Sequence, residues 1–306
     1  MQQLRQVGVE LQLAPIRDAE RGPRAKVIGP VRAKEQTRGM HTSSFAVTVS
    51  MVVALSASLA FAGGPGSWKQ LGKTGEWKGT RTGASMGDKL YTTEVNGALY
   101  VTDANTGAWK QIGKREFART VFLATGGDKL YSMETNGSLY VIDPGNGSWK
   151  QLGKPGAWGN TIAGVVHNGT LYTAETNGGL YATDLATGAW KAVGKPEFGD
   201  TIVLFSSGSK LYSIEKGGSL YEIDPSSGTW KGIGRPNDWR GTTAAAVLDG
   251  KLYTTDTTGQ LYESDLATGK WKVLAKDFGD TVVIFPAKAA LLTIGNGGSL
   301  YQVQVK

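Results

Sequence analysis

Residues 109–153, WKQIGKREFARTVFLATGGDKLYSMETNGSLYVIDPGNGSWKQLG, decide the fold because this stretch begins and ends on nearly the same five residues. Trp-Lys opens both copies, and such pairs recur along the chain at intervals of 40 or 41 residues. A constant period of about 40 residues indicates one supersecondary unit repeated several times. The tryptophans of the six pairs are Trp68, Trp109, Trp149, Trp190, Trp230 and Trp271. Most of the recurring residues are therefore expected to be scaffold.

Each repeat is predicted to contain a tight β-hairpin. Within the quoted stretch, Leu130-Tyr131 and Leu139-Tyr140 flank the dipeptide Asn136-Gly137, and glycine holds the second place of this dipeptide in all six repeats. Type I′ hairpin turns need positive φ at both central residues, which Asn and Gly tolerate. We therefore expect a type I′ turn between two apolar strands in every repeat.

A second turn and two further strands complete the repeat. Asp143 precedes Gly147 and the next Trp-Lys strand, and an aspartate stands at the equivalent place in five repeats. Its side chain can accept hydrogen bonds from backbone N–H groups inside the turn. The sixth repeat ends before such a turn and lacks the aspartate, which favours a structural role. An apolar run such as 201–205 supplies the fourth strand.

Four short strands in each of six repeats, with no amphipathic helical pattern, predict an all-β fold. The expected architecture is a six-bladed β-propeller with four antiparallel strands per blade. The first repeat element is a lone Trp68 strand, and the last blade stops after its third strand, at Lys306. The Trp68 strand is therefore expected to complete the last blade and so remove an open sheet edge.

The N-terminal part of the chain differs in character from the repeats. Residues 45–61 form an apolar run that ends in a small-x-small pattern before Gly63, as secretory signal peptides do. We expect residues 1–39 to be a disordered leader or the product of a misplaced start, 40–62 to be a signal peptide, and 63–306 to be the propeller. An uncleaved signal segment is the one expected route to a membrane. The predicted location is secreted, periplasmic or in the cell envelope.

Charge and cysteine content narrow the function classes. The formal net charge is +7, but eight Lys/Arg and four Asp/Glu lie within 1–62, so the propeller carries only +3. This charge does not demand nucleic acid as a partner. With no cysteine, the chain has neither disulfides nor thiol chemistry. No cofactor is expected.

The connections between blades carry an alternating aromatic residue. Each connection has a tryptophan or phenylalanine, followed three residues later by a threonine. The aromatics are Trp77, Phe117, Trp158, Phe198, Trp239 and Phe278, and the threonines are Thr80, Thr120, Thr161, Thr201, Thr242 and Thr281. One interpretation is that Trp77, Trp158 and Trp239 stack on sugars, with Thr80, Thr161 and Thr242 as hydrogen-bonding partners. The other is that the aromatics plug gaps between blades and the threonines start strands.

A ring of carboxylates precedes the hairpins, and the sixth blade has Gly295 in the same place. Its members are Glu94, Glu134, Glu175, Glu215 and Asp256. Because the turn forms without the acid in blade six, these groups are candidates for a ligand groove. Glu94, Glu175 and Asp256 are the predicted binding residues. The alternative is that they are solvated strand ends near a lysine.

Signals for an enzyme are poor. The chain has two histidines, one of them at 41, and has no zinc-ligand cluster, phosphate loop or nucleophile elbow. The carboxylate ring leaves a glycosidase open. Arg81, Arg119 and Arg240 near the inner strands suggest a sialidase-like anion clamp, but the Asp-to-Gly gap in the turn is too long for a sialidase Asp-box. We expect a protein that is not an enzyme, with no metal and no catalytic residues.

The repeat resembles the tectonin repeat. The residues that carry the likeness are 109–113, 128–131, 137–140 and 149–153, with Trp-x-x-Ile/Leu, a Gly, two strands and Gly-x-Leu-Tyr before the next Trp. Residues 139–149 also look like half of a kelch repeat, although its double glycine is not kept. Resemblance to tectonin implies a lectin-type propeller with glycan sites between blades. In blade six, Leu292 replaces tyrosine and Gly295 replaces the acid.

Three function hypotheses follow. The first is an exported, multivalent glycan-binding module with weak single sites on the face of the inter-blade connections. The second is an envelope scaffold for protein partners, which the kelch likeness favours. The third is a glycan-cleaving hydrolase. Carbohydrate or a cell-surface glycan is thus the expected partner, with a protein as the alternative.

Overall fold

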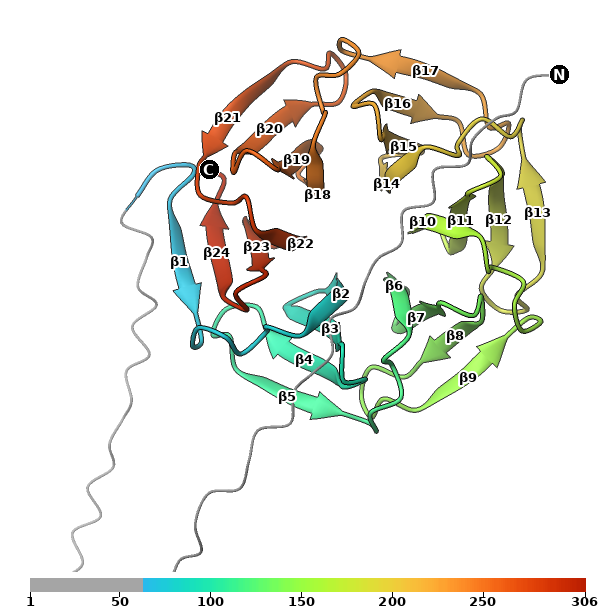
Figure 1. Cartoon of the computed structure of the whole chain (residues 1–306), viewed down its shortest axis with the longest axis horizontal. Coiled ribbons are helices and arrows are strands. Elements are labelled where there is room, and N and C mark those ends of the chain that lie inside the picture. The colour runs from blue at the N-terminus through green and yellow to red at the C-terminus, as the bar shows by residue number, and fades with distance from the viewer. Residues whose placement is uncertain (1–62) are drawn as a thin grey trace, which may run out of the picture. The chain divides into compact units, whose positions relative to one another are not determined.

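The computed structural model describes residues 63–306 as a closed ring of six four-stranded antiparallel sheets (Figure 1). This confirms the predicted six-bladed β-propeller. The predicted leader, 1–39, and signal peptide, 40–62, lie outside the described residues. In 63–306 every regular element is a strand, and no helix there is long and apolar enough to cross a membrane.

Each blade runs from its innermost strand outward along the chain. Blade 1 consists of β2 (Thr80–Met86), β3 (Lys89–Glu94), β4 (Leu99–Asp103) and β5 (Trp109–Ile112). Blade 2 consists of β6 (Thr120–Gly126), β7 (Lys129–Glu134), β8 (Leu139–Ile142) and β9 (Trp149–Leu152). Blade 3 consists of β10 (Thr161–His167), β11 (Thr170–Glu175), β12 (Leu180–Asp184) and β13 (Trp190–Val193).

The second half of the ring repeats this order. Blade 4 consists of β14 (Thr201–Ser207), β15 (Lys210–Glu215), β16 (Leu220–Ile223) and β17 (Trp230–Ile233). Blade 5 consists of β18 (Thr242–Leu248), β19 (Lys251–Asp256), β20 (Leu261–Asp265) and β21 (Trp271–Ala275). Blade 6 consists of β22 (Thr281–Ala287), β23 (Ala290–Gly295), β24 (Leu300–Gln304) and β1 (Trp68–Leu71).

The ring is closed by the first strand of the propeller, as predicted. β1 pairs antiparallel with β24, with Trp68 opposite Val303 and Leu71 opposite Leu300. The outer edge of blade 6 is therefore covered by a strand from the other end of the repeat region. This pairing gives blade 6 the same four strands as the other blades and leaves no gap in the ring.

The core lies between neighbouring blades. The two leucines that flank each hairpin, such as Leu90 and Leu99 in blade 1, are completely buried. Each hydrophobic cluster joins residues of two adjacent blades, as where Ile112 of blade 1 packs with Leu123 of blade 2. Burial of apolar surface on both faces of every sheet accounts for the apolar strands on which the sequence argument depended.

The hairpin is confirmed, but its turn is not type I′. In the β3–β4 connection only Gly97 has positive φ, at 83°, and Asn96 does not. The N–H of Gly97 donates to the carbonyl of Glu94, and the N–H of Glu94 donates to the carbonyl of Ala98. This is a three-residue loop in which a tight turn ends in a left-handed glycine. The asparagine contributes its side chain instead, because Asn96 Oδ1 accepts from the N–H of Ala98 at 2.9 Å.

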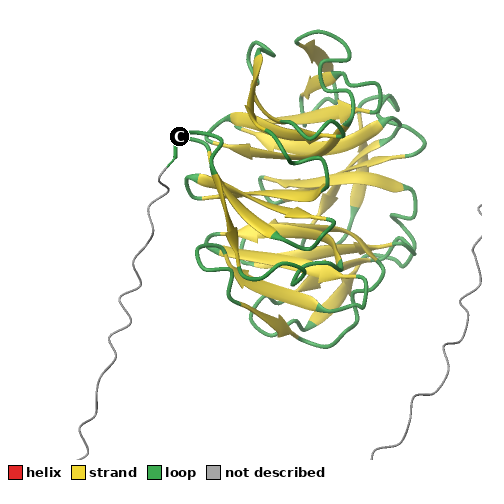
Figure 2. Cartoon of the chain, turned by 60° about the vertical axis from the view of Figure 1, so that its left-hand side comes forward, coloured by secondary structure: helices red, strands yellow, loops and turns green. Residues whose placement is uncertain are grey.

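The aspartate of the outer turn has the predicted structural role. Asp103 Oδ1 accepts hydrogen bonds from the backbone N–H groups of Asn105 and Thr106 at 3.1 and 3.0 Å. Its other oxygen lies 3.6 Å from Nζ of Lys89 on the neighbouring strand. Figure 2 shows connecting loops at both faces of the ring. Because β3, β4 and β5 are successively antiparallel, the hairpins and these turns lie at opposite ends of the strands.

Candidate functional site

The three tryptophans predicted to stack on sugars are buried. Trp77 and Trp158 are each 2% exposed and Trp239 is 4% exposed. Their indole nitrogens point inward to strand hydroxyls, as where Trp158 Nε1 donates to Thr183 Oγ1 at 3.3 Å. Their faces are covered by protein, so the role of stacking platform does not fit these positions. The alternative interpretation, in which they fill gaps between blades, agrees with this burial.

Glycines make room for these indoles. A Cβ added at Gly72, Gly153 or Gly234 would lie 2.7 Å from the six-membered ring of Trp77, Trp158 or Trp239 respectively. Each of these glycines also has positive φ, which an L side chain rarely adopts. The glycine of the Trp-Lys-x-x-Gly pattern is therefore a packing requirement for the following tryptophan.

The threonine and carboxylate rings pair with one another. Thr80 Oγ1 donates to Glu94 Oε1 at 2.9 Å, and Thr120 with Glu134 and Thr201 with Glu215 repeat the same bond. Burial raises the pKa of the Glu94 carboxyl, and the hydrogen bond from Thr80 opposes this rise. Glu94 is 4% exposed, so the alternative interpretation as a solvated strand end does not hold either.

The other predicted residues are engaged differently. The buried Thr161 hydroxyl has no hydrogen-bond partner within 63–306, although Glu175 stands opposite in register. Thr242 donates to the Trp239 carbonyl at 2.8 Å. Burial raises the pKa of Glu175. Asp256 accepts hydrogen bonds from its own turn, at Thr258 and Gln260. Thr242 and Asp256 thus stabilise blade ends through their hydrogen bonds, and no one site brings together all nine predicted residues.

The exposed aromatics are the tryptophans of the Trp-Lys pairs, whose regular recurrence predicts a scaffold role. All six are between 42% and 52% exposed. Each stands edge-on to the tyrosine of the neighbouring strand, with ring centroids 4.7 to 5.3 Å apart. The signal that could have identified them is their position, because the outermost strand of a propeller blade has no neighbour on one edge.

In two blades the connecting loop supplies a carboxylate that holds this indole. Trp149 Nε1 donates to Glu116 Oε2 at 2.9 Å in blade 2, and Trp230 Nε1 donates to Glu197 Oε2 at 2.8 Å in blade 4. Both blades have phenylalanine as the buried loop aromatic. In blade 1, which has tryptophan there, Glu76 turns back to the N–H of Lys73. The alternation of tryptophan and phenylalanine in the loops thus coincides with a structural difference between blades. Both indole–carboxylate pairs lie in blades whose loop aromatic is phenylalanine, not in the tryptophan blades for which binding was predicted.

A hollow lies beside each of these indoles. The blade 2 hollow has a volume of about 170 Å³, and the blade 4 hollow has a volume of about 290 Å³. The first is lined by Glu116, Phe117, Arg119, Glu134, Asn136, Tyr140 and Trp149. In blade 5 the equivalent space is only about 10 Å³, and there the Tyr262 hydroxyl donates to Asp256. Glu134 and Glu215 of the predicted carboxylate ring thus line the hollows of blades 2 and 4. Glu94 and Glu175 line neither of these two hollows.

The hollow in blade 2 combines an aromatic edge with charged groups of both signs. Burial raises the pKa of Glu134, whereas the Thr120 hydrogen bond and the nearby Arg119 lower it. An indole, a phenol, two carboxylates and a guanidinium can contact a polyhydroxylated ligand through its apolar face and its hydroxyl groups. Arg119 is the one member of the suggested anion clamp that lines this hollow. Within 63–306 no group of three or more His, Cys, Asp or Glu side chains could hold a metal ion.

These features define a propeller repeat protein with recurring aromatic and carboxylate hollows. The model of the PQQ_2 family, described as outer membrane protein assembly factor BamB, matches residues 50–271. The chain belongs to this family. The family match covers the same repeats but is to neither the tectonin nor the kelch family, so the resemblance to those repeats is not confirmed. No curated protein matches the sequence.

Solved propellers share the fold at low identity. A structural genomics protein of unknown function from Bacteroides thetaiotaomicron has 12% identity and a TM-score of 0.60, over 78% of this chain and 73% of that one. Virginiamycin B lyase from Staphylococcus aureus has 12% identity and a TM-score of 0.55, over 78% and 99%. A chain of the nidogen/laminin complex has 15% identity and a TM-score of 0.55, over 64% and 80%. Identity this low shows the fold alone.

Proposed function

We propose that this chain is an exported or envelope binding module that recognises glycans weakly at repeated hollows, and that it does not catalyse a reaction. The observation that carries the proposal is the paired arrangement in blades 2 and 4. In both, a half-exposed indole is held by a loop carboxylate at the edge of a hollow that also contains a second glutamate, which is buried in blade 2 and half-buried in blade 4.

The chemistry of the hollow suits a sugar. Trp149 and Tyr140 provide apolar surface against which the C–H face of a sugar ring can pack. Glu116 and Glu134 accept hydrogen bonds from sugar hydroxyls, and Arg119 donates them. The hydrogen bond from Trp149 to Glu116 fixes the indole before a ligand arrives, so less side-chain entropy is lost on binding.

The size of the hollows sets the expected strength. Spaces of about 170 and 290 Å³ are smaller than the 300 to 1,000 Å³, in rough terms, of sites that enclose drug-sized ligands. Each is expected to hold one sugar unit with low affinity. Two sites on one rigid ring then gain through avidity on a surface that presents many copies of the glycan.

The test is a glycan array with the purified full-length protein and a Trp149→Ala/Trp230→Ala variant. The matched control is Trp109→Ala/Trp190→Ala, because these tryptophans are equally exposed and stand edge-on to tyrosines. In the described part of the chain they have no hydrogen bond to a loop carboxylate. Glycan binding that the first variant loses and the control keeps supports the proposal. Absence of binding, or equal loss in both variants, contradicts it.

Family membership favours a second candidate, a scaffold for envelope proteins. The family's description as an outer membrane protein assembly factor supports a place in the cell envelope and protein partners for this chain as the second proposal. A protein partner would cover a larger surface than one hollow. Cross-linking in envelope extracts, followed by identification of the captured protein, separates the two functions, because a scaffold should keep its partner in the Trp149→Ala/Trp230→Ala variant.

A further inference from the structure

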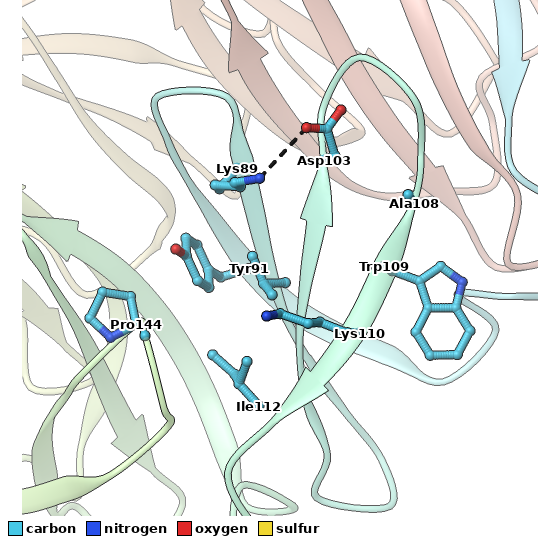
Figure 3. Close-up of a pocket in the computed structure, with 10 residues that line it drawn as sticks. Lys89, Tyr91, Asp103, Ala108, Trp109, Lys110, Ile112 and Pro144 are labelled. Carbon is cyan, nitrogen blue, oxygen red and sulfur yellow. Dashed lines mark ion pairs between the residues drawn. The ribbon is translucent and has the colours of Figure 1, made fainter. Parts of the chain in front are cut away.

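A cavity of about 400 Å³ lies between blades 1 and 2, away from the hollows described above. Tyr91, Val101 and Lys110 stand side by side in register on β3, β4 and β5 and form one wall. The turn at Pro144 in blade 2 forms the opposite wall. Figure 3 shows Tyr91, Lys110 and Ile112 pointing toward Pro144, while Trp109 points the other way.

The same three register positions are filled differently in blades 4 and 5. There the middle residue is a glutamate that pairs with the lysine, Glu222 with Lys231 at 3.1 Å and Glu263 with Lys272 at 3.2 Å. The tyrosine stands on the other side of the glutamate, as Tyr253 does. Burial, followed by the Glu263 carboxylate, raises the pKa of Tyr253 to about 12. Two blades thus hold a carboxylate between a lysine and a tyrosine.

Blade 1 has the lysine and the tyrosine but no carboxylate. Val101 stands at the glutamate position, and Lys110 makes no hydrogen bond or ion pair with any residue of the described 63–306. The rim ion pair of Lys89 and Asp103 is neutral as a unit, so Lys110 leaves the cavity with one unpaired positive charge. Lys110 is exposed at the open side of the cavity, so its ammonium can pair with a carboxylate that lies against the apolar wall.

The neighbouring turn explains why the space is open in blade 1. In blade 4 the corresponding turn residue of the next blade is Leu266, which packs against Tyr212. In blade 2, Leu185 fills the equivalent position against Tyr131 and Val141. Blade 1 faces Pro144, which is shorter than leucine, and Val101 is shorter than glutamate. Both walls of the cavity are therefore set back in blade 1.

We propose that this cavity binds a small carboxylic acid with an apolar body. The ligand carboxylate lies between the Lys110 ammonium and the Tyr91 hydroxyl, where blades 4 and 5 have the carboxylate of Glu222 and Glu263. The apolar body packs against Val101, Ile112 and Pro144. Burial, with Asp143 nearby, raises the pKa of Tyr91, so its hydroxyl stays protonated and can donate a hydrogen bond at neutral pH.

The test uses phenylacetate as the probe and phenylacetamide as its uncharged match, with the full-length protein. Backbone amide signals of residues 110 and 145 should shift in a saturable way with phenylacetate, with millimolar affinity as expected for a ligand of this size. Phenylacetamide should bind at least about tenfold more weakly, because it cannot pair with the ammonium.

Two variants with matched controls locate the site. Val101→Glu should abolish the shifts, because it places an internal carboxylate on Lys110 as in blades 4 and 5. Val141→Glu makes the same change in blade 2 and should leave them unchanged. Lys110→Gln should weaken binding at least about fivefold, and Lys150→Gln should not. Lys110→Gln tests the proposal even if Val101→Glu disturbs folding.

The outcomes are separate from those of the proposed function. The Trp149→Ala/Trp230→Ala variant should bind phenylacetate as the parent does, whether or not any glycan binds. Absence of saturable shifts with phenylacetate overturns the inference. So does equal binding of the acid and the amide, or shifts that persist in both Val101→Glu and Lys110→Gln.

Discussion

The indole nitrogen of Trp149 donates a hydrogen bond of 2.9 Å to Glu116, which precedes it by 33 residues and lies in the loop that enters the same blade. Trp230 and Glu197 repeat the relationship two blades later at 2.8 Å and the same separation. The outermost and innermost parts of a blade are thereby connected at its rim. In these blades the orientation of an exposed aromatic is fixed by the loop, and the loop differs between alternate blades.

Removing the loop carboxylate should impair binding without unfolding the protein. Glu116→Ala/Glu197→Ala frees two indoles, and because these pairs are exposed we expect the free energy of unfolding to change by less than about 1 kcal/mol. Glycan binding should fall, since the indole loses its fixed orientation and the site loses an acceptor. Titration of the variant with a glycan that binds the parent measures this directly.

Glu76→Ala is the control for that change. It removes an acid from the loop of blade 1, where the side chain accepts from the N–H of Lys73 and contacts no exposed indole. It should keep the affinity of the parent. Undiminished binding by Glu116→Ala/Glu197→Ala would show that the loop acids play no part in recognition.

The two classes of tryptophan should differ sharply in their effect on stability. Trp158 is 2% exposed and packs on Gly153, so Trp158→Ala leaves a large cavity and should cost about 3–5 kcal/mol of unfolding free energy. Trp190 is 52% exposed, and Trp190→Ala should cost about 1 kcal/mol or less. Urea unfolding followed by circular dichroism compares them. Similar costs for both would contradict the assignment of one class to the core and the other to the rim.

The period of the sequence was sufficient to predict the fold, but it could not assign the aromatics. Blade number, strand number and closure by the Trp68 strand follow from spacing alone. Whether a tryptophan is buried depends on what its ring meets, and Trp77 is buried because Gly72 leaves room for it. That contact joins a strand end to a loop whose conformation the period does not specify. The repeated glycine was visible in the sequence, but its purpose was not.

The hairpin turns illustrate the same limit. Asn96-Gly97 has the composition of a type I′ turn, yet the loop contains three residues and only the glycine has positive φ. The register is fixed instead by Glu94 and Ala98, whose pairing sets where β3 ends and β4 begins. Dipeptide composition therefore located the turn correctly, whereas strand register determined its type.

Thr120 and Thr161 occupy equivalent positions in blades 2 and 3, one with a paired hydroxyl and the other with one that is unpaired within 63–306. Thr120 donates to Glu134 at 2.9 Å, whereas the buried Thr161 hydroxyl has no partner among the described residues. Thr120→Val leaves a buried carboxylate without its donor and should cost about 1–3 kcal/mol. Thr161→Val removes an unsatisfied group and should fall within about 0.5 kcal/mol of the parent.

Thermal and urea unfolding of these two variants give the answer, because the substitutions have the same shape and the same strand position. A Thr161→Val variant as destabilised as Thr120→Val would mean that the Thr161 hydroxyl has a partner in solution. Glu175 is the nearest candidate, since it stands opposite Thr161 in the β10–β11 register.

The buried glutamates and the turn aspartates should give stability opposite dependences on pH. Burial raises the pKa of Glu94, Glu175 and Glu215 in the folded state. A raised pKa means that the folded protein binds these protons more tightly than the unfolded chain does. The resulting stabilisation is present below the ordinary carboxyl pKa and is lost as pH rises through the raised value.

The aspartates act in the other direction. Hydrogen bonds from Thr187 lower the pKa of Asp184, and the hydrogen bond from Lys251 lowers the pKa of Asp265 to about 2. Their stabilisation is present above the ordinary pKa and is lost as pH falls through the lowered value. Urea midpoints measured from about pH 3 to about pH 8 should therefore decline at both ends of the range.

The Glu94→Gln/Glu175→Gln variant isolates the upper part of that profile. It removes two groups that must lose a proton in a buried place, so it should be more stable than the parent at neutral pH, and this advantage should shrink as pH falls toward 4. Glu116→Gln controls for the loss of negative charge at an exposed position. A variant with the parent's slope between about pH 5 and pH 8 would show that water reaches these carboxylates and that the blade ends open in solution.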